Sequence, residues 1–295
     1  MSEKELNRKI QELEDQLRQR DAELGRHRSE LLRVNQLLET MIADMSQDLK
    51  MAALIQRILS PTELPNIGGV EFSTKFVPGT DSGGDYFDIF EHEDKLKFGL
   101  VLACSSGYAM SALFLSILIQ MSSKIEARKG LAPELVLEQM AREIVPNVNE
   151  RDQAHVFYGV MDRRNFELTF SSCGPIAAYH QQADSKTWAR LEPTASALAK
   201  DFQQKPLRQT ITMNSHDRLV LCTQGVIGAK NKAGQEFGME RLLESLNRAP
   251  RTGVHELRNE ILFQVEKFSG LSEPLRDQTV LVMEIKDRVI KLAKR

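Results

Sequence analysis

The chain has 295 residues, of which 41% are hydrophobic and 27% are charged, an ordinary composition for a globular protein. This length suffices for one large domain with an appendage. The formal net charge of −2 gives no electrostatic reason to expect a nucleic-acid partner. No apolar run reaches the roughly 20 residues of a membrane-spanning helix. The residues after Met1 also lack the basic and apolar regions of a secretory signal.

The three cysteines of the chain are Cys104, Cys173 and Cys222, and each has apolar neighbours in a strand-like segment. They are too few and too scattered for a disulfide framework or a zinc site. We therefore expect reduced thiols and a cytoplasmic protein.

The first segment carries an apolar seam whose members follow alternating three- and four-residue steps. The seam residues are Leu6, Ile10, Leu13, Leu17, Leu24, Leu31, Val34, Leu38, Met41 and Met45. A narrow apolar seam on an otherwise charged helix can be buried only against another helix of the same kind. Because the rest of the chain offers no second seam, residues 1–59 predict a dimerisation helix with its linker, and hence a homodimer.

Two polar residues, Arg20 and His27, fill gaps in this seam at successive d positions. The favoured interpretation is that they weaken the coil and fix its register; a pH-sensing role for His27 is the alternative. The helix is expected to end at Ser60, because a residue that precedes a proline disfavours helical geometry.

The remainder, residues 60–287, predicts an α+β domain. Strands are expected at 70–76, 86–90, 96–104, 156–162, 166–172, 176–180, 188–191, 209–213, 218–222 and 279–285, and helices at 110–128, 133–145, 239–246 and 254–268. Strands in runs and helices in pairs indicate two packed antiparallel sheets with helices on both outer faces. The basic tail, residues 288–295, is either a frayed terminus or a segment that touches a membrane surface.

Three loops rich in glycine or acidic residues stand out: Gly83–Asp88, Ser105–Gly107 and Thr223–Ala229. Each alone is a common kind of turn. Together with Ala53–Pro61 and Arg276–Thr279, their order and spacing resemble the SpoIIE/RsbU-type branch of the PPM (PP2C-like) serine/threonine phosphatases. The resemblance extends from Ala53 to Ile285, and the Gly-Gly-Asp-Tyr-Phe-Asp and Gly-Val…Asn…Phe-Gly patterns are its most specific parts.

The resemblance implies an αββα sandwich that removes phosphate from serine or threonine of small regulatory proteins. It also implies two Mn²⁺ or Mg²⁺ ions held by aspartates at four motif positions, and an N-terminal helical element that dimerises the protein. Site-loop residues carried over from these motifs are Gly83, Gly84, Asp88, Ser106, Gly107, Gly225 and Asp277.

At the four metal-ligand positions the chain has Asp85, Cys104, Gln224 and Arg276. Hard divalent cations need oxygen ligands, preferably carboxylates. The four aspartates of the family carry four negative charges, whereas these four side chains sum to zero. We therefore expect no metal cofactor and no catalytic residue, because water activation in this family depends on the metal ions.

The favoured interpretation is a non-catalytic regulatory module that dimerises through its coil and binds a signalling protein, phosphorylated or not. Ser105–Gly107 could present backbone N–H groups to a phosphate. The alternative is an active phosphatase whose Mn²⁺ or Mg²⁺ site is rebuilt from Asp85, Asp88 and Asp277. A structural adaptor, in which the domain is a spacer, is a third possibility.

The position of Arg276 leaves two arrangements open. Its guanidinium either enters the cavity and forms an ion pair with Asp85, which would replace the metal cross-link, or points to solvent as surface arginines usually do.

Overall fold

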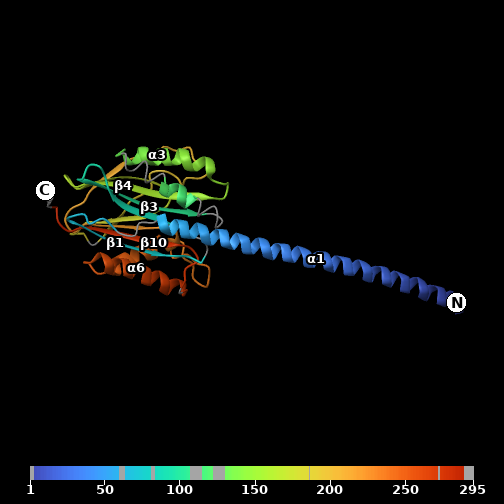
Figure 1. The fold of residues 1–295 in the computed structure, drawn as a ribbon. Coiled ribbons are helices and arrows are strands. Elements are labelled where there is room, and N and C mark those ends of the chain that lie inside the picture. The colour runs from blue at the N-terminus through green and yellow to red at the C-terminus, as the bar shows by residue number, and fades with distance from the viewer. Residues whose placement is uncertain are drawn as a thin grey trace. The chain divides into compact units, whose positions relative to one another are not determined.

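The computed structural model describes residues 3–59, 64–80, 84–106, 115–121, 130–185, 187–271 and 273–288. The chain separates into two units, Met1–Met51 and Ala52–Arg295, and Figure 1 labels the main elements of both. Among the described residues, none of the helices combines the length and the apolar character that a bilayer crossing requires.

The N-terminal unit is helical throughout its described length, as part of α1 (Glu3–Leu59). This confirms the long N-terminal helix. The seam side chains are uncovered within one chain, with exposed fractions from 46% at Val34 to 66% at Leu17. The side chains of Leu6 and Ile10 lie outside the described residues. A second helix of the same kind would bury this seam, but the structure contains one chain. The dimer therefore stays a prediction.

The domain contains two five-stranded sheets, and every pair of neighbouring strands is antiparallel. Sheet A has the order β1 (Val70–Val77), β10 (Gln278–Ile285), β9 (Arg218–Cys222), β6 (Ala177–Gln181) and β7 (Trp188–Arg190). Sheet B has the order β2 (Tyr86–Glu91), β3 (Lys97–Ser106), β4 (Gln153–Asp162), β5 (Glu167–Cys173) and β8 (Gln209–Thr212). Two antiparallel sheets were predicted, and the prediction is confirmed.

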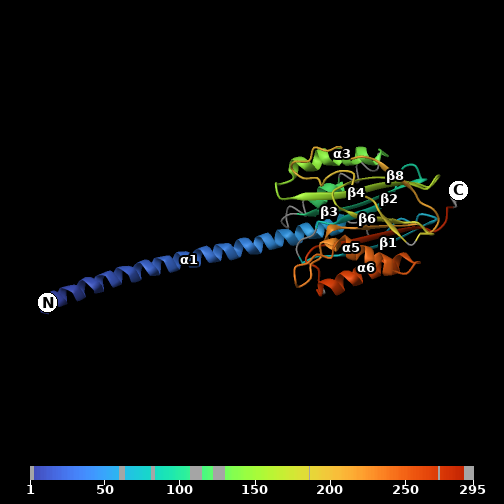
Figure 2. The ribbon, with the colours of Figure 1, turned by 180° about the vertical axis from the view of Figure 1, so that it is seen from behind.

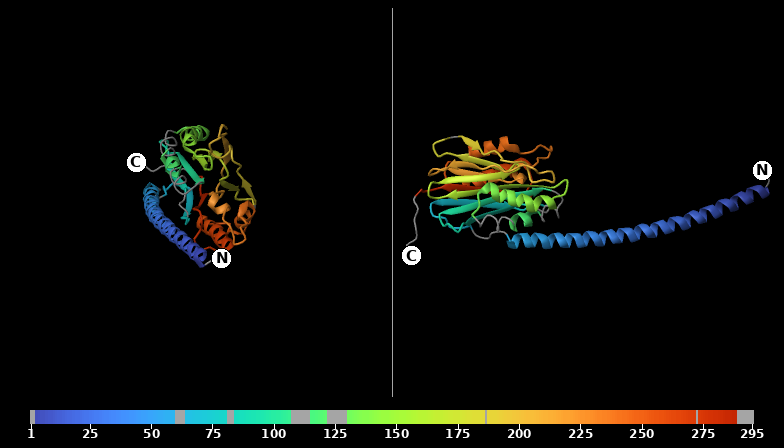
Figure 3. Two further views of the ribbon diagram at one scale, coloured as in Figure 1. Left: turned by 90° about the vertical axis from the view of Figure 1, so that its right-hand side faces the viewer. Right: turned by 90° about the horizontal axis from the view of Figure 1, so that it is seen from above.

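Helices cover the outer face of each sheet. On sheet B lie α3 (Pro133–Ile144) and the helical residues 115–121, and on sheet A lie α5 (Gly238–Arg248) and α6 (Val254–Ser269). Figure 2 shows α5 and α6 together on one side of the sandwich, with α3 on the other side. The views in Figure 3 show the two sheets between these helical layers. This is the predicted αββα sandwich.

The alternation of side chains along β3 shows how one strand serves two cores. Leu100, Leu102 and Cys104 belong to the core between the sheets. Val101 and Ala103 belong to the core beneath the helices. Because successive residues of a strand point to opposite faces, an apolar run such as this one is buried on both sides.

The structure also contains short elements that periodicity does not predict. A 3₁₀ turn, η2 (Val145–Asn147), follows α3, and α4 (Gln224–Ile227) follows β9. β4 begins at Gln153, three residues before the expected start, because its register pairs it with β3 as far as Ser106. The predicted helix at 110–128 is described at 115–121, where it is helical, and its other residues lie outside the described chain.

The first residue of the basic tail packs against the domain. Arg288 donates hydrogen bonds to Asn214 Oδ1 at 3.1 Å and to the carbonyl oxygen of Asn165 at 2.7 Å. Its guanidinium lies 5.0 Å from the ring centroid of Phe166, a distance at which cation–π attraction is significant. Residues 289–295, on which the membrane-surface alternative rests, lie outside the described chain.

His92 provides a pH-dependent contribution to stability. Its buried ring lies 5.5 Å from the Phe90 ring, and its Nε2 lies 3.4 Å from the Tyr158 hydroxyl. Burial lowers the pKa of His92 below its ordinary value of 6.5, and the charge of Lys97 adds to the effect. The unfolded state therefore binds a proton more readily than the folded state, and stability falls as the pH drops below about 6.5.

We predict that His92→Gln makes the free energy of unfolding less dependent on pH between about 7 and 5 than it is in the wild type. Urea unfolding across this range measures the effect. Equal slopes in the two proteins would contradict it.

Candidate functional site

The carboxylate of Asp85 cross-links the two sheets at one end of the sandwich. Asp85 immediately precedes β2 of sheet B and is 7% exposed. Its Oδ2 accepts hydrogen bonds from the hydroxyls of Thr223, at 2.6 Å, and Thr279, at 2.8 Å. Thr223 directly follows β9 and Thr279 lies in β10, so both donors come from sheet A. One carboxylate oxygen therefore ties sheet B to two strands of sheet A.

The two threonines also hold each other. The backbone N–H of Thr279 donates to Thr223 Oγ1 at 3.0 Å, and the backbone N–H of Thr223 donates to the Thr279 carbonyl at 3.1 Å. The Thr223 hydroxyl therefore acts as donor and acceptor at once, and both residues are fully buried. Sequence reasoning missed these residues, although each lies within or beside a motif that it identified.

Asp277 directs its carboxylate at backbone groups. Its Oδ1 accepts from the Gly79 N–H at 2.8 Å, and its Oδ2 lies 3.5 Å from the Asp85 nitrogen. A Cβ atom on Gly225 would lie 1.8 Å from the Asp277 carbonyl oxygen, so the close approach of these two loops requires glycine. The carboxylate of Asp277 thus supports the loops around it.

Burial governs the acidity of both carboxyl groups. It raises the pKa of Asp85 well above the usual value, and the nearby charge of Asp277 raises it further, against the effect of the two threonine hydrogen bonds. Burial also raises the pKa of Asp277, which its hydrogen bonds from Gly79 and Asp85 oppose. Desolvation disfavours the charged form of such groups.

Cys104 and Gln224 lie beside Asp85 but offer weak ligands. The Cys104 side chain is 3% exposed, and its sulfur accepts a hydrogen bond from the Gln224 backbone. Burial, followed by the charge of Asp85, raises the pKa of the thiol, so it stays protonated at neutral pH. Within the described part of the chain, Gln224 Oε1 is buried without a hydrogen-bond partner.

Arg276 is exposed, and it does not form the ion pair with Asp85 that one interpretation predicted. No ion pair within the described residues joins these two side chains, and Asp85 Oδ2 instead accepts from the threonine hydroxyls of sheet A. The positive charge of Arg276 nevertheless affects a buried side chain. The pKa of His155 is lowered to about 4, mainly by burial and secondly by the positive charge of Arg276.

Other predicted site residues are dispersed. Asp88 accepts a hydrogen bond from the Tyr86 hydroxyl at 3.1 Å, and Tyr86 belongs to the core beneath the helices, so Asp88 faces away from Asp85. A Cβ atom on Gly84 would lie 2.0 Å from Ser105 Oγ, which explains the glycine. Gly83 and Gly107 lie outside the described residues.

This donor set does not fit a pair of Mn²⁺ or Mg²⁺ ions. Among the described residues, no three histidine, cysteine, aspartate or glutamate side chains are grouped so that they could hold a metal. One oxygen of Asp85 is taken by two hydroxyls, and the carboxylate of Asp277 accepts from backbone N–H groups. The remaining positions supply a thiol, an amide and a guanidinium, whereas these ions prefer several carboxylate oxygens.

Two hollows open beside this cluster, and both include Gln224 and Arg276 in their walls. The polar hollow, of about 470 Å³, is lined by Ser106, Arg151, Gln153, His155, Pro175, Gln224 and Arg276. The second hollow, of about 260 Å³, has a mixed lining, in which Ala229, Leu271, Pro274 and Leu275 lie among the polar residues Lys230, Glu236, Ser269 and Gln278. The arrangement can accept a polar group and an apolar group side by side.

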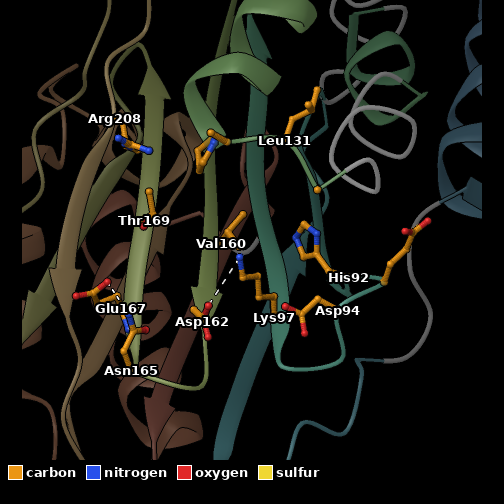
Figure 4. Close-up of a pocket in the computed structure, with 14 residues that line it drawn as sticks. His92, Asp94, Lys97, Leu131, Val160, Asp162, Asn165, Glu167, Thr169 and Arg208 are labelled. Carbon is orange, nitrogen blue, oxygen red and sulfur yellow. Dashed lines mark hydrogen bonds and ion pairs between the residues drawn. The ribbon is translucent and has the colours of Figure 1, made fainter.

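A third hollow, of about 440 Å³, lies on the helix-covered face of sheet B (Figure 4). Its cations are matched by neighbouring carboxylates. Lys97 Nζ lies 3.7 Å from Asp162 Oδ2, and Arg208 Nε lies 3.9 Å from Glu134 Oε1. Its lining also includes Glu93, Asp94 and Glu167, so it is a weaker candidate for an anionic ligand than the polar hollow, whose described wall has no acidic residue.

The αββα sandwich and the loops at its end define a PP2C-like phosphatase domain. The family model for stage II sporulation protein E (SpoIIE) matches residues 94–286. The chain therefore belongs to the SpoIIE family. The predicted family is confirmed.

Curated relatives include phosphoserine phosphatase RsbU of Bacillus subtilis, which is 22% identical over 214 residues, or 71% of this chain and 63% of RsbU. Protein IcfG of Synechocystis is 22% identical over 261 residues, or 77% of this chain and 41% of IcfG. The chain thus spans less than two thirds of the length of either relative.

Solved structures share the fold. The SiaA-PP2C domain of Pseudomonas aeruginosa has a TM-score of 0.68 at 18% identity, over 82% of this chain and 97% of the domain. The RsbU and RsbW domains of Rv1364c from Mycobacterium tuberculosis give 0.64 at 19% identity, over 77% of this chain and 62% of that one. RsbX in complex with magnesium gives 0.56 at 14% identity, over 76% and 98%.

We predict that Thr223→Val lowers the free energy of unfolding by about 1–3 kcal/mol, because it removes a buried donor from Asp85 and an acceptor from Thr279. Thr210→Val is the matched control, since the hydroxyl contact of Thr210 with Thr169 is exposed, and its effect should stay within about 0.5 kcal/mol. Urea unfolding measures both. Equal losses in the two variants would show that the cross-link contributes little.

Proposed function

We propose that this domain is a non-catalytic, phosphatase-like regulatory module that binds a signalling protein. The observation that carries the proposal is the use of Asp85 Oδ2 by two threonine hydroxyls, together with an arginine, Arg276, at the motif position where the family has a metal-binding aspartate. Two unit charges 4 Å apart interact by about 4 kcal/mol at the effective dielectric of a protein surface. A permanent cation at this position therefore opposes the binding of a dication.

Without metal ions, the described residues around Asp85 supply no replacement for the reaction. In this family, the ions lower the pKa of the attacking water and neutralise the phosphoryl group. The Cys104 thiol is buried and protonated, so it is a poor nucleophile. Binding without hydrolysis follows from this combination.

The proposed partner is a regulatory protein that is phosphorylated in one of its states. One relative is named a phosphoserine phosphatase, and one solved relative carries an RsbW domain beside its RsbU domain. The activity and partners of the longer relatives extend to this chain only as part of this proposal.

The second candidate is an active metal-dependent serine/threonine phosphatase. It is favoured by the proximity of two carboxyl groups, since the charge of Asp277 raises the pKa of Asp85. One Mn²⁺ or Mg²⁺ ion bound between them would make such a site. Asp88, the third acid of this candidate, faces the helical layer.

Calorimetric titration with Mn²⁺ separates the two candidates. We expect no saturable binding in the millimolar range and no manganese-dependent hydrolysis of a phosphoserine peptide, because the site lacks carboxylate ligands. The triple variant Cys104→Asp/Gln224→Asp/Arg276→Asp, checked for folding by circular dichroism, restores the acidic positions and should gain metal affinity. Manganese-dependent turnover in the wild type that Asp85→Ala abolishes, while folding is retained, would establish the active phosphatase instead.

We further propose that α1 joins two copies of the chain. The seam residues from Leu13 to Met45 are roughly half or more exposed in a single chain, and a second copy of the same seam would bury them. Homodimerisation would give the module the arrangement that the family resemblance implies.

Leu31→Lys tests this coil, with Leu32→Lys as its control. Both leucines are exposed, at 65% and 58%, but Leu31 lies on the seam and Leu32 beside it at the outward b position. We expect Leu31→Lys to convert a dimer to a monomer, because it places a charge in the apolar seam, and Leu32→Lys to leave the dimer intact. Sedimentation equilibrium measures the mass. A wild-type monomer, or equal behaviour of the two variants, would contradict the proposal.

A further inference from the structure

The polar hollow beside Asp85 is cationic. Arg151 and Arg276 line it, together with neutral polar groups that include Ser106 and Gln153. Among the described residues in its wall, none is an aspartate or a glutamate. A concave surface lined by one sign of charge attracts ligands of the opposite sign.

The nearest acidic side chains of the cluster do not cancel this charge from within the hollow. Asp85 is buried against the hydroxyls of Thr223 and Thr279. Asp277 is buried, and its carboxylate accepts from the Gly79 backbone. Both carboxylates serve the link between sheets and loops, and neither lines the hollow.

Arg276 lies in the wall that the polar hollow shares with the second hollow. Its side chain is exposed, and no ion pair to it occurs within the described residues. A guanidinium presents several N–H donors in a fixed plane that matches phosphate oxygens in pairs. From this position, Arg276 can bind an anionic group in the polar hollow. The peptide that carries this group can then extend into the second hollow.

Gln224, in the same shared wall, provides an independent indication of a ligand. Its Oε1 is buried and has no hydrogen-bond partner within the described residues. Unpaired buried acceptors are uncommon in folded proteins and call for a partner. A backbone N–H of a bound peptide would satisfy this oxygen.

We infer that the polar hollow binds the phosphate of a phosphorylated serine or threonine in a protein partner, with Arg276 as its main contact and without hydrolysis. The second hollow then receives the residue next to the phosphorylated one, and an apolar side chain there would lie against Leu271 and Leu275. This inference rests on the proposed function, because it assigns to a metal-free site the anion that the arginines favour. The replaced metal site thus becomes a phosphate-recognition site.

The test is calorimetric titration of the full chain with the acetylated tripeptide glycine–phosphoserine–leucine, in the presence of EDTA. The unphosphorylated tripeptide and inorganic phosphate are titrated in parallel. We expect the phosphorylated tripeptide to bind more tightly than either, because it alone fills both hollows. Equal binding of inorganic phosphate would restrict the site to a free anion and overturn the peptide assignment.

Variants locate the site. Arg276→Ala should weaken binding of the phosphorylated tripeptide about tenfold or more, as expected when a charge-assisted contact is lost. Arg276→Lys should recover part of it, because lysine keeps the charge but not the planar fork. Arg208→Ala, which removes an exposed arginine from the hollow of Figure 4, should change nothing. An unchanged affinity in Arg276→Ala would overturn the inference.

The outcomes for this inference and for the proposed function are separable. If the phosphorylated tripeptide fails to bind in EDTA and manganese also fails to bind, the phosphate-recognition site is rejected and the metal-free module stands. If the tripeptide binds only with manganese and loses its phosphate, the domain is an enzyme and both proposals fall. Binding in EDTA with the phosphate retained supports both.

Discussion

The hydrogen bonds from Thr223 and Thr279 to one oxygen of Asp85 are the constraint on which the site depends. In a metal-dependent phosphatase, an aspartate here would face ions that themselves bridge the loops. In this chain, hydroxyl donors from sheet A bind one oxygen of Asp85, and protein groups make this link between the sheets. The loops that carry Gln224 and Arg276 can therefore hold their positions without a bound ion. An oxygen that already accepts two short hydrogen bonds is also a poorer ligand for a cation.

The replacement of the other acidic residues changes the charge of this surface more than its shape. The fold remains close to that of the SiaA-PP2C domain, with a TM-score of 0.68, and the loops still meet at one end of the sandwich. The carboxylates that remain are buried, whereas the arginines are exposed. An exposed surface of positive charge attracts anions more than cations. The chain thus keeps the family's fold while the charge at the four motif positions differs from that of four aspartates.

The layers of the fold could be predicted because their signals are local. The bounds of β9 match the prediction residue for residue, and α6 differs by a single residue at its end. The site was less accessible to such reasoning. His155 enters it because β4 pairs with β3 in a register that places His155 opposite Cys104, and a single sequence does not specify that register. The contacts of Asp85 and the outward direction of Arg276 depend on side-chain packing between distant segments, which motif positions do not determine.

If two copies of the chain pair through the uncovered leucine seam of α1, the pairing would change how strongly the proposed target is held. A helix that joins two chains places two recognition surfaces on one particle, so a target that carries two phosphorylated segments would meet the second surface at a high effective concentration. Modest affinity at each surface then gives durable capture, while a target with one such segment escapes quickly. The number of phosphorylated segments, more than the strength of any one contact, would decide which proteins are retained.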